Sequence, residues 1–422
     1  MILNDLRHSL KEATHQDNSP FDSEEETKEH FRVWVVEEIP CLDRTGDEIK
    51  QEICTKLKLL YDNFEKTLDE ATNKSAKAHL EHAMTNEIKN LLESNLNLIL
   101  TGAPGTGKTF TAKKVAEEII TEGLADANEK KRAMEERFKS VQFHPGYDYA
   151  DFVIGMKPVL LSGEGKELEM KNGKYVEVET GAEVAAGEIS KAQVSFRWKD
   201  GFFKKFADEA RKAYNAAEDK ENAPRFVFLV DEINRADLSR VFGELFSLLE
   251  DGYRYPNENG SDSILLPNGD RFSIPKNLFV IGTMNDIDRS VESMDFALRR
   301  RFAWKEVKPE DTADAILASI PQKQALLAKM NAVNELIRSD EFRLGCEYQL
   351  GGAIFAKFGK CGGDFERLWK NHIEIILNEY LRGRRDRKEL VDKLKAVFDG
   401  APKTTGTTMQ PAATAEATPG AQ

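Results

Sequence analysis

The segment from Gly102 to Thr109 places the strongest constraint on how this chain folds. It reads Gly-Ala-Pro-Gly-Thr-Gly-Lys-Thr and so satisfies the pattern G-x-x-x-x-G-K-[ST]. The apolar run from Leu96 to Leu100 precedes it, and apolar residues recur at helical spacing after Lys108. Because this pattern binds phosphate where a buried strand passes through a loop into a helix, the sequence predicts a strand–loop–helix unit of an α/β domain.

The composition of this loop indicates a site for the phosphates of a nucleotide. Glycines let backbone N–H groups turn inward around phosphate oxygens, and the positive end of the following helix adds to the attraction. We expect Lys108 to reach the β- and γ-phosphates and Thr109 to offer its hydroxyl to Mg²⁺. The expected nucleotide-binding residues are Gly102, Ala103, Pro104, Gly105, Thr106, Gly107, Lys108, Thr109 and Phe110.

Two further apolar runs end in polar residues that suit hydrolysis. Phe226 to Val230 is followed by Asp231 and Glu232, and Leu278 to Gly282 leads to Asn285. We expect Asp231 to share in holding Mg²⁺, Glu232 to orient or deprotonate the attacking water, and Asn285 to position that water. Because polar residues after parallel strands meet at one edge of the sheet, the three side chains are expected to lie together.

Three consecutive arginines, Arg299 to Arg301, follow the last of these strands in the chain. An arginine supplied by a neighbouring subunit can neutralise charge on a transferring phosphoryl group, an effect of roughly 10³ to 10⁵ in rate. A plain basic surface is the alternative interpretation. Within one subunit these arginines have no phosphate to serve, so the sequence favours an assembly in which subunits share their sites.

The charge balance limits the partners that the whole chain can attract. Lys and Arg number 60 against 73 Asp and Glu, a net charge of −13, which does not suit a general nucleic-acid coat. The four cysteines lie far apart without a C-x-x-C pair, which argues against a zinc ribbon or a disulfide framework. No apolar stretch approaches the roughly 20 residues of a membrane span, and no signal-peptide segment is visible. We expect a cytoplasmic protein without membrane contact.

The chain divides by its composition and hydrophobic pattern into four parts. We expect a mostly helical acidic region over residues 1–84, the α/β nucleotide-binding domain over 85–308, a helical lid domain over 309–400 and a disordered tail over 401–422. Residues 157–200 alternate turns with short β-prone pieces, which predicts an inserted hairpin or small β-subdomain. A second hairpin is expected around residues 264–274.

Several motifs in the same order resemble the McrB family, the motor subunits of methylation-dependent restriction systems. The resemblance extends from about Leu96 to Gly383. Its motifs are the loop above, Phe143 to Phe152 (FHPGYDYADF), Asp231 to Arg240 (DEINRADLSR), Gly282 to Ser290 (GTMNDIDRS) and Asp295 to Phe302 (DFALRRRF). The resemblance implies an AAA+ P-loop NTPase core, with a parallel sheet flanked by helices, β-hairpin insertions and a C-terminal α-helical lid.

The family's Met-Asn-x-x-Asp signature implies catalytic positions in the third motif. Asn285 and Asp288 stand at its two polar positions. Asp286 and Ile287 replace the small residues that usually lie between them.

Two further elements imply contacts between subunits. Arg235, after the acid pair, resembles an interface residue that contacts the adjacent subunit or its nucleotide. By the same resemblance Arg299 and Arg300 are the trans-acting arginines. The catalytic set expected from all of these arguments is Glu232, Asn285, Asp288, Arg299, Arg300 and Arg235.

The resemblance implies a homo-oligomer, a hexameric ring, that hydrolyses ATP or GTP with Mg²⁺. The loop contacts phosphates common to both nucleotides, so both stay open, and the signature favours GTP. A McrC-like nuclease subunit would cleave, and DNA would be reached through the complex, since no nuclease centre is visible in this chain.

Two other functions are compatible with these motifs. One is an AAA+ ATPase that remodels or assembles protein complexes without DNA, as in the MoxR-like and dynein-like groups, and the net charge of −13 suits it. The other is a binding scaffold without turnover, which the intact Lys108, Thr109, Asp231 and Glu232 disfavour.

Overall fold

The computed structural model describes residues 84–185, 192–257, 262–287 and 299–400, together with Ile189 and Gly260. The predicted N-terminal region up to residue 83 and the predicted tail from residue 401 lie outside the described residues. Among the described helices none is long and apolar enough to cross a membrane.

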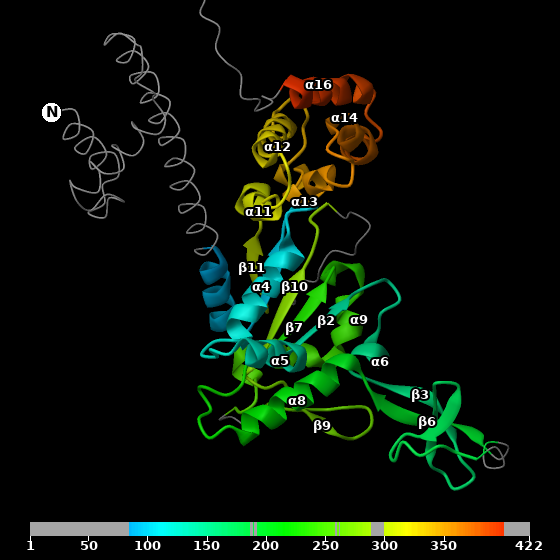
Figure 1. Ribbon diagram of the computed structural model, residues 1–422. Coiled ribbons are helices and arrows are strands. Elements are labelled where there is room, and N and C mark those ends of the chain that lie inside the picture. The colour runs from blue at the N-terminus through cyan, green and yellow to red at the C-terminus, as the bar shows by residue number, and fades with distance from the viewer. Residues whose placement is uncertain are drawn as a thin grey trace, which may run out of the picture. The chain divides into compact units, whose positions relative to one another are not determined.

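A five-stranded parallel sheet forms the centre of the nucleotide-binding domain, in the order β11-β1-β10-β7-β2 (Figure 1). Its strands are β1 (Asn97–Thr101), β2 (Phe138–Gln142), β7 (Phe226–Asp231), β10 (Leu278–Thr283) and β11 (Ala303–Glu306). The three apolar runs predicted from the sequence are therefore three adjacent strands. They are apolar without interruption because helices cover both faces of the sheet.

Alternate side chains of these strands enter two different cores, as the twofold repeat of a strand requires. Val227 and Leu229 of β7 pack with the helix at residues 84–95 and with α4, whereas Phe228 and Val230 pack with α8 on the opposite face. The helices and turns of this domain are α4 (Lys108–Ile120), α5 (Ala127–Arg137), α6 (Tyr149–Phe152), α8 (Phe202–Ala216), η1 (Ile233–Arg235), α9 (Leu238–Phe242), η2 (Gly243–Leu249) and η3 (Asp251–Tyr253).

A separate antiparallel sheet occupies the predicted insertion, in the order β5-β4-β3-β6. Its strands are β3 (Ile154–Leu161), β4 (Glu167–Lys171), β5 (Lys174–Glu177) and β6 (Gln193–Asp200). The sheet begins at Ile154, slightly before the predicted start at residue 157. A Cβ at Gly201 would lie 2.3 Å from the carbonyl carbon of Phe152, so only glycine lets the chain return beside its own starting point. The second hairpin consists of β8 (Ile264–Leu265) and β9 (Arg271–Phe272).

Helices follow the sheet domain from Pro309 onward and enclose a core of their own, with Met330, Val333, Phe355 and Phe398 among its buried residues (Figure 1). They are α11 (Pro309–Ile316), α12 (Lys323–Ile337), η4 (Cys346–Tyr348), α13 (Gly352–Phe355), η5 (Ala356–Phe358), α14 (Phe365–Leu368), the π-helical turn η6 (Trp369–Ile373), α15 (Glu374–Tyr380) and α16 (Arg387–Gly400). We refer to this helical part as the lid.

Candidate active site

The loop between β1 and α4 has the backbone of a phosphate cradle. Gly105 and Gly107 have φ of 78° and 80°, a region that glycine enters at little cost. A Cβ at Gly102 would lie 2.4 Å from the carbonyl oxygen of Val307. No side chain caps the start of α4, and its first turn contains no acidic residue. The first N–H groups of this helix are therefore left to an anion, which fits the phosphates of a nucleotide.

Lys108 is held inside this loop. Its side chain reaches back so that Nζ donates to the carbonyl oxygens of Gly102 at 2.9 Å and Ala103 at 2.8 Å, and the residue is only 7% exposed. The ammonium thus lies where the loop curves, as phosphate binding requires. Phe110, the last residue of the expected set, lies on α4 with its ring largely exposed.

Thr109 and Asp231 come together from α4 and β7. Thr109 Oγ1 donates to Asp231 Oδ1 at 2.8 Å, and the hydroxyl of Thr283 donates to the same carboxylate oxygen. Oxygen groups of this kind are the ligands that Mg²⁺ prefers, so the pair fits the ion that the sequence implies. Sequence reasoning assigned no role to Thr283, although its place at the end of β10 could have indicated one.

Glu232 and Asn285 form a second pair beside the first. Asn285 Nδ2 donates to Glu232 Oε1 at 2.8 Å, and the backbone of Glu232 has φ 51° and ψ 47°, a left-handed conformation that costs free energy for a residue with a side chain. Glu232 Oε2 is buried and accepts no hydrogen bond from the described residues, and it lies 3.4 Å from Nε of Arg235. One carboxylate oxygen is therefore fixed by Asn285 while the other can accept a hydrogen bond.

The signature after β10 connects three parts of the molecule. The pKa of the Asp286 carboxyl is raised above its ordinary value, chiefly by desolvation and also by the negative charges of Glu306 and Glu347, while Lys108 and the N–H of Gly102 act in the opposite direction. Ile287, the next residue, packs against the core of the lid. The two positions that depart from the family signature thus contact the phosphate loop and the lid. Asp288 lies outside the described residues.

The lid is joined directly to the phosphate loop by backbone hydrogen bonds. Gly351 N–H donates to the carbonyl oxygen of Pro104 at 3.0 Å, and Ala353 N–H donates to that of Gly105 at 3.0 Å. Thr312 of α11 adds a bond from its hydroxyl to the carbonyl oxygen of Thr106 at 2.5 Å. Any movement of the lid therefore acts on the loop.

The arginines lie at the opposite edge of the sheet from the phosphate loop of the same chain. They precede β11, which runs parallel to β1, and the amide of Asn97 at the start of β1 donates to the carbonyl oxygen of Arg301 at 3.1 Å. The five residues of β1 separate this edge from Gly102, on the order of 16 Å at about 3.3 Å per residue. The structure thus brings together the other described residues expected to be catalytic but leaves Arg299 and Arg300 apart from them.

Comparison with known proteins gives a matching family and two similar restriction-enzyme components. A family described as "AAA domain (dynein-related subfamily)" matches residues 97–302. The McrB subunit of the type IV methyl-directed restriction enzyme EcoKMcrB from Escherichia coli K12 is 31% identical over 298 residues, which cover 67% of this chain and 53% of the relative. The chain is similar to the McrB family of AAA+ proteins. It spans about half the length of this relative.

Two other proteins are similar to this chain. YdiS, a component of the type II restriction enzyme BsuMI from Bacillus subtilis 168, is 28% identical over 271 residues, covering 61% of this chain and 69% of YdiS. A solved structure from Cytophaga hutchinsonii, described as a candidate ATPase, superposes with a TM-score of 0.30 at 12% identity, over 82% of this chain and 99% of that one. This last similarity is too weak to bear on the fold.

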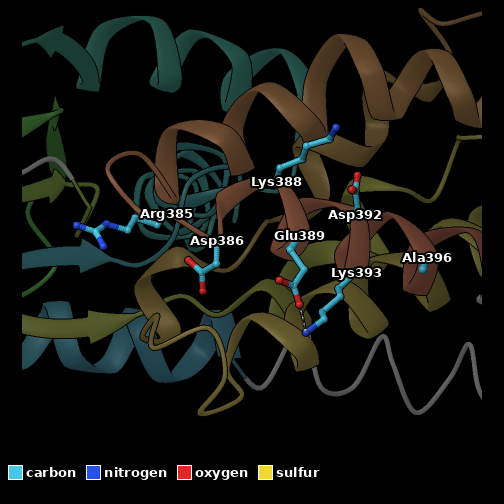
Figure 2. A pocket seen from close by; sticks show the side chains of 7 residues that line it. All are labelled: Arg385, Asp386, Lys388, Glu389, Asp392, Lys393 and Ala396. Carbon is cyan, nitrogen blue, oxygen red and sulfur yellow. Dashed lines mark ion pairs between the residues drawn. The ribbon is translucent and has the colours of Figure 1, made fainter.

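A concave region separate from the phosphate loop lies on the lid. A depression of about 640 Å³ lies along α16, and Figure 2 shows its lining side chains, which carry both positive and negative charges. Glu389 and Lys393, one turn apart on α16, form an ion pair at 3.2 Å. The lining residues are Arg385, Asp386, Lys388, Glu389, Asp392, Lys393 and Ala396. None of them belongs to the nucleotide site.

Proposed function

We propose that this chain is a ring-forming AAA+ NTPase that hydrolyses ATP or GTP with Mg²⁺ and acts as the motor subunit of a McrBC-like restriction system. The observation that carries the proposal is the division of one site between two edges of the sheet. Lys108, Thr109, Asp231 and Glu232 meet at one edge, while the arginines lie at the other. A complete site then requires the arginine edge of a neighbouring subunit.

Within one subunit, each group has a distinct task. Lys108 and the N–H groups at the start of α4 bind the phosphates, and Thr109 with Asp231 would hold Mg²⁺, which neutralises phosphate charge when bound. Glu232 Oε2 accepts a hydrogen bond from the attacking water and orients or deprotonates it. Asn285 holds the other oxygen of that carboxylate, so the acceptor cannot rotate away from the water.

The neighbouring subunit completes the site. Arg299 and Arg300 place guanidinium charge near the phosphoryl group of the adjacent protomer, where it stabilises the charge that develops during transfer. Arg235, whose side chain is about half exposed beside Glu232, lies where it can contact the adjacent subunit. A closed ring supplies each loop with one arginine edge, and six subunits are the expected number.

Contact with DNA belongs to the complex in this proposal. Two of the lid arginines that could bind phosphate are paired with acids: Arg382 with Glu379 at 3.1 Å and Arg384 with Asp386 at 2.6 Å. A net charge of −13 also opposes extended binding of DNA by this chain alone. Both curated relatives are restriction-enzyme components by name, which supports a nuclease partner of the McrC type.

A turnover assay tests the proposal. The purified chain is given ATP or GTP with Mg²⁺, with and without DNA and with the product of the neighbouring gene. We expect hydrolysis that rises when the partner is present. Absence of hydrolysis of both nucleotides under all of these conditions would refute it.

The inserted sheet favours one alternative, an ATPase that remodels protein complexes. Val194, Phe196 and Trp198 of β6 alternate along one face and are 70%, 63% and 41% exposed, and Met156 faces Trp198 across the strand pair. An apolar face of this kind suits a protein surface more than DNA. Hydrolysis that a protein client stimulates and that DNA and the nuclease leave unchanged would favour this alternative.

A further inference from the structure

The carboxylate of Glu250 joins two of the three arginines. Glu250 follows η2 and precedes η3, and its Oε1 lies 2.8 Å from Nη2 of Arg301 and 3.6 Å from Nη2 of Arg300. The third arginine is held differently, because the Arg299 guanidinium lies over the ring of Trp304 at 5.9 Å from its centroid. Glu250 therefore acts on Arg300 and Arg301 and not on Arg299.

The two arginines bound by Glu250 differ in their freedom. The Arg301 side chain is only 12% exposed and its pair is short, whereas the Arg300 side chain is 62% exposed and its pair is long. An exposed ion pair at this distance contributes little to stability and exchanges readily. Arg301 is thus an anchor for the carboxylate, and Arg300 is the guanidinium that can leave it for another anion.

A buried polar network fixes the backbone beneath these side chains. Asn97 Nδ2 donates to the carbonyl oxygen of Leu249 at 2.6 Å and to that of Arg301 at 3.1 Å, so one amide ties the residue before Glu250 to the arginine segment. Arg254 is fully buried and donates to Asn97 Oδ1 at 2.5 Å, and burial lowers its pKa to about 9. The backbone that carries Glu250 and Arg301 is therefore held in one frame, while the Arg300 side chain above it stays exposed.

Arg300 also has space in which to move. A cavity of about 420 Å³ is lined by Arg300 and Glu250 together with Asn95 and Asp251, among other residues. The guanidinium borders this open space and is not packed into its own chain.

We propose that Glu250 is the positioning residue of Arg300. It holds the Arg300 guanidinium at the arginine edge until that guanidinium binds the phosphates held by the neighbouring subunit. This inference rests on the trans-arginine part of the proposed function. Glu250 itself touches no substrate, and Arg301 serves as its anchor and not as a second catalytic arginine.

Substitution of Glu250 by Gln tests the role of its charge. We expect Glu250→Gln to lower kcat by roughly 10- to 100-fold, because a misplaced catalytic group loses about this much, and to leave KM for the nucleotide unchanged. Glu250→Asp keeps the charge and should restore part of kcat. The same variant provides the test of side-chain position if the Gln variant does not fold. The matched control is Glu122→Gln, which removes another carboxylate shared by two cations, Lys89 at 2.7 Å and Arg225 at 2.6 Å, and should hydrolyse like wild type.

Mixed assemblies separate this inference from the proposed function. Lys108→Ala subunits have a phosphate loop that cannot support hydrolysis but an intact arginine edge. Mixed with either Arg300→Ala or Glu250→Gln subunits, they should restore hydrolysis, because both defects lie on the donating edge. Recovery with Arg300→Ala but not with Glu250→Gln would overturn the role of Glu250 and leave trans catalysis standing. Recovery with neither would refute trans catalysis, and wild-type kcat in Glu250→Gln alone would refute the positioning role.

Discussion

Gly351→Ala should uncouple the lid from the phosphate loop. A Cβ at this position would lie 2.1 Å from the carbonyl carbon of Gly105 and 2.2 Å from the nitrogen of Thr106. Both neighbours are backbone atoms, which cannot rotate out of the way. The backbone segments around Gly351 and Gly105 must therefore separate by more than about 1 Å to reach ordinary contact distance.

The cost follows from the contacts that this separation breaks. The hydrogen bonds from Gly351 to Pro104 and from Ala353 to Gly105 contribute about 1 kcal/mol each. Overpacking adds about 1–3 kcal/mol, so the joined state of lid and loop loses about 3–5 kcal/mol. Because nucleotide binding uses the loop in its joined state, and about 1.4 kcal/mol is a factor of ten in affinity, we expect nucleotide binding weakened by roughly 100-fold or more.

A titration with a fluorescent nucleotide analogue in the presence of Mg²⁺ measures the effect. The matched control is Gly359→Ala in the same lid, where an added Cβ would meet no atom within 4 Å. The control should bind like wild type. Equal Kd values for Gly351→Ala and wild type would refute the direct attachment of the lid to the loop.

Three further substitutions address the loop edge of the site. Glu232→Gln should keep nucleotide affinity and lose roughly 10²- to 10⁴-fold in kcat, since it removes the group that acts on water; unchanged turnover in a hydrolysis assay would contradict this role. Thr109→Ala should raise the Mg²⁺ concentration needed for half-maximal hydrolysis, and an unchanged Mg²⁺ titration would count against a role in holding the ion. Asp286→Asn should raise the melting temperature at pH 7, because the pKa of Asp286 is raised in the folded chain. The stability that the carboxyl contributes is therefore fully present below its ordinary pKa of 3.8 and is lost as pH rises through the pKa of the folded chain. The advantage of the Asn variant should vanish in thermal melts below about pH 4, and a constant difference at all pH values would contradict the assigned shift.

The sequence was sufficient to predict the sheet and the loop edge because these depend on short, local patterns. An uninterrupted apolar run followed by a polar residue marks a buried parallel strand and the end where ligands bind, and the positions of Asp231 and Asn285 at this end were predicted in this way. The helix α8 was missed, although Phe203, Phe206 and Ala210 repeat at helical spacing. Its position directly after a turn-rich insertion concealed it.

The arginine frame could not be predicted, because it depends on contacts between distant parts of the chain. Asn97 looks like an ordinary member of a strand, yet its amide bonds to Arg301, 204 residues away. Arg254 breaks the rule that charged side chains are exposed, and nothing beside it in the sequence indicates burial. The attachment of Gly351 to the loop is equally non-local, since a glycine in a lid segment usually indicates only a turn.

The strand β1 sets the geometry that connects these findings. Its first residue carries the amide that fixes the arginine frame, and its last residue leads into the phosphate loop. Because β1 is buried and paired on both sides, with β10 and β11, its length cannot change during turnover. The distance between the phosphate loop and the backbone of the arginine segment in one subunit is therefore constant. In the proposed ring, a change in how an arginine meets a phosphate would then come from the Arg300 side chain, from movement between subunits, or from the lid, which is the part that bonds to the loop itself.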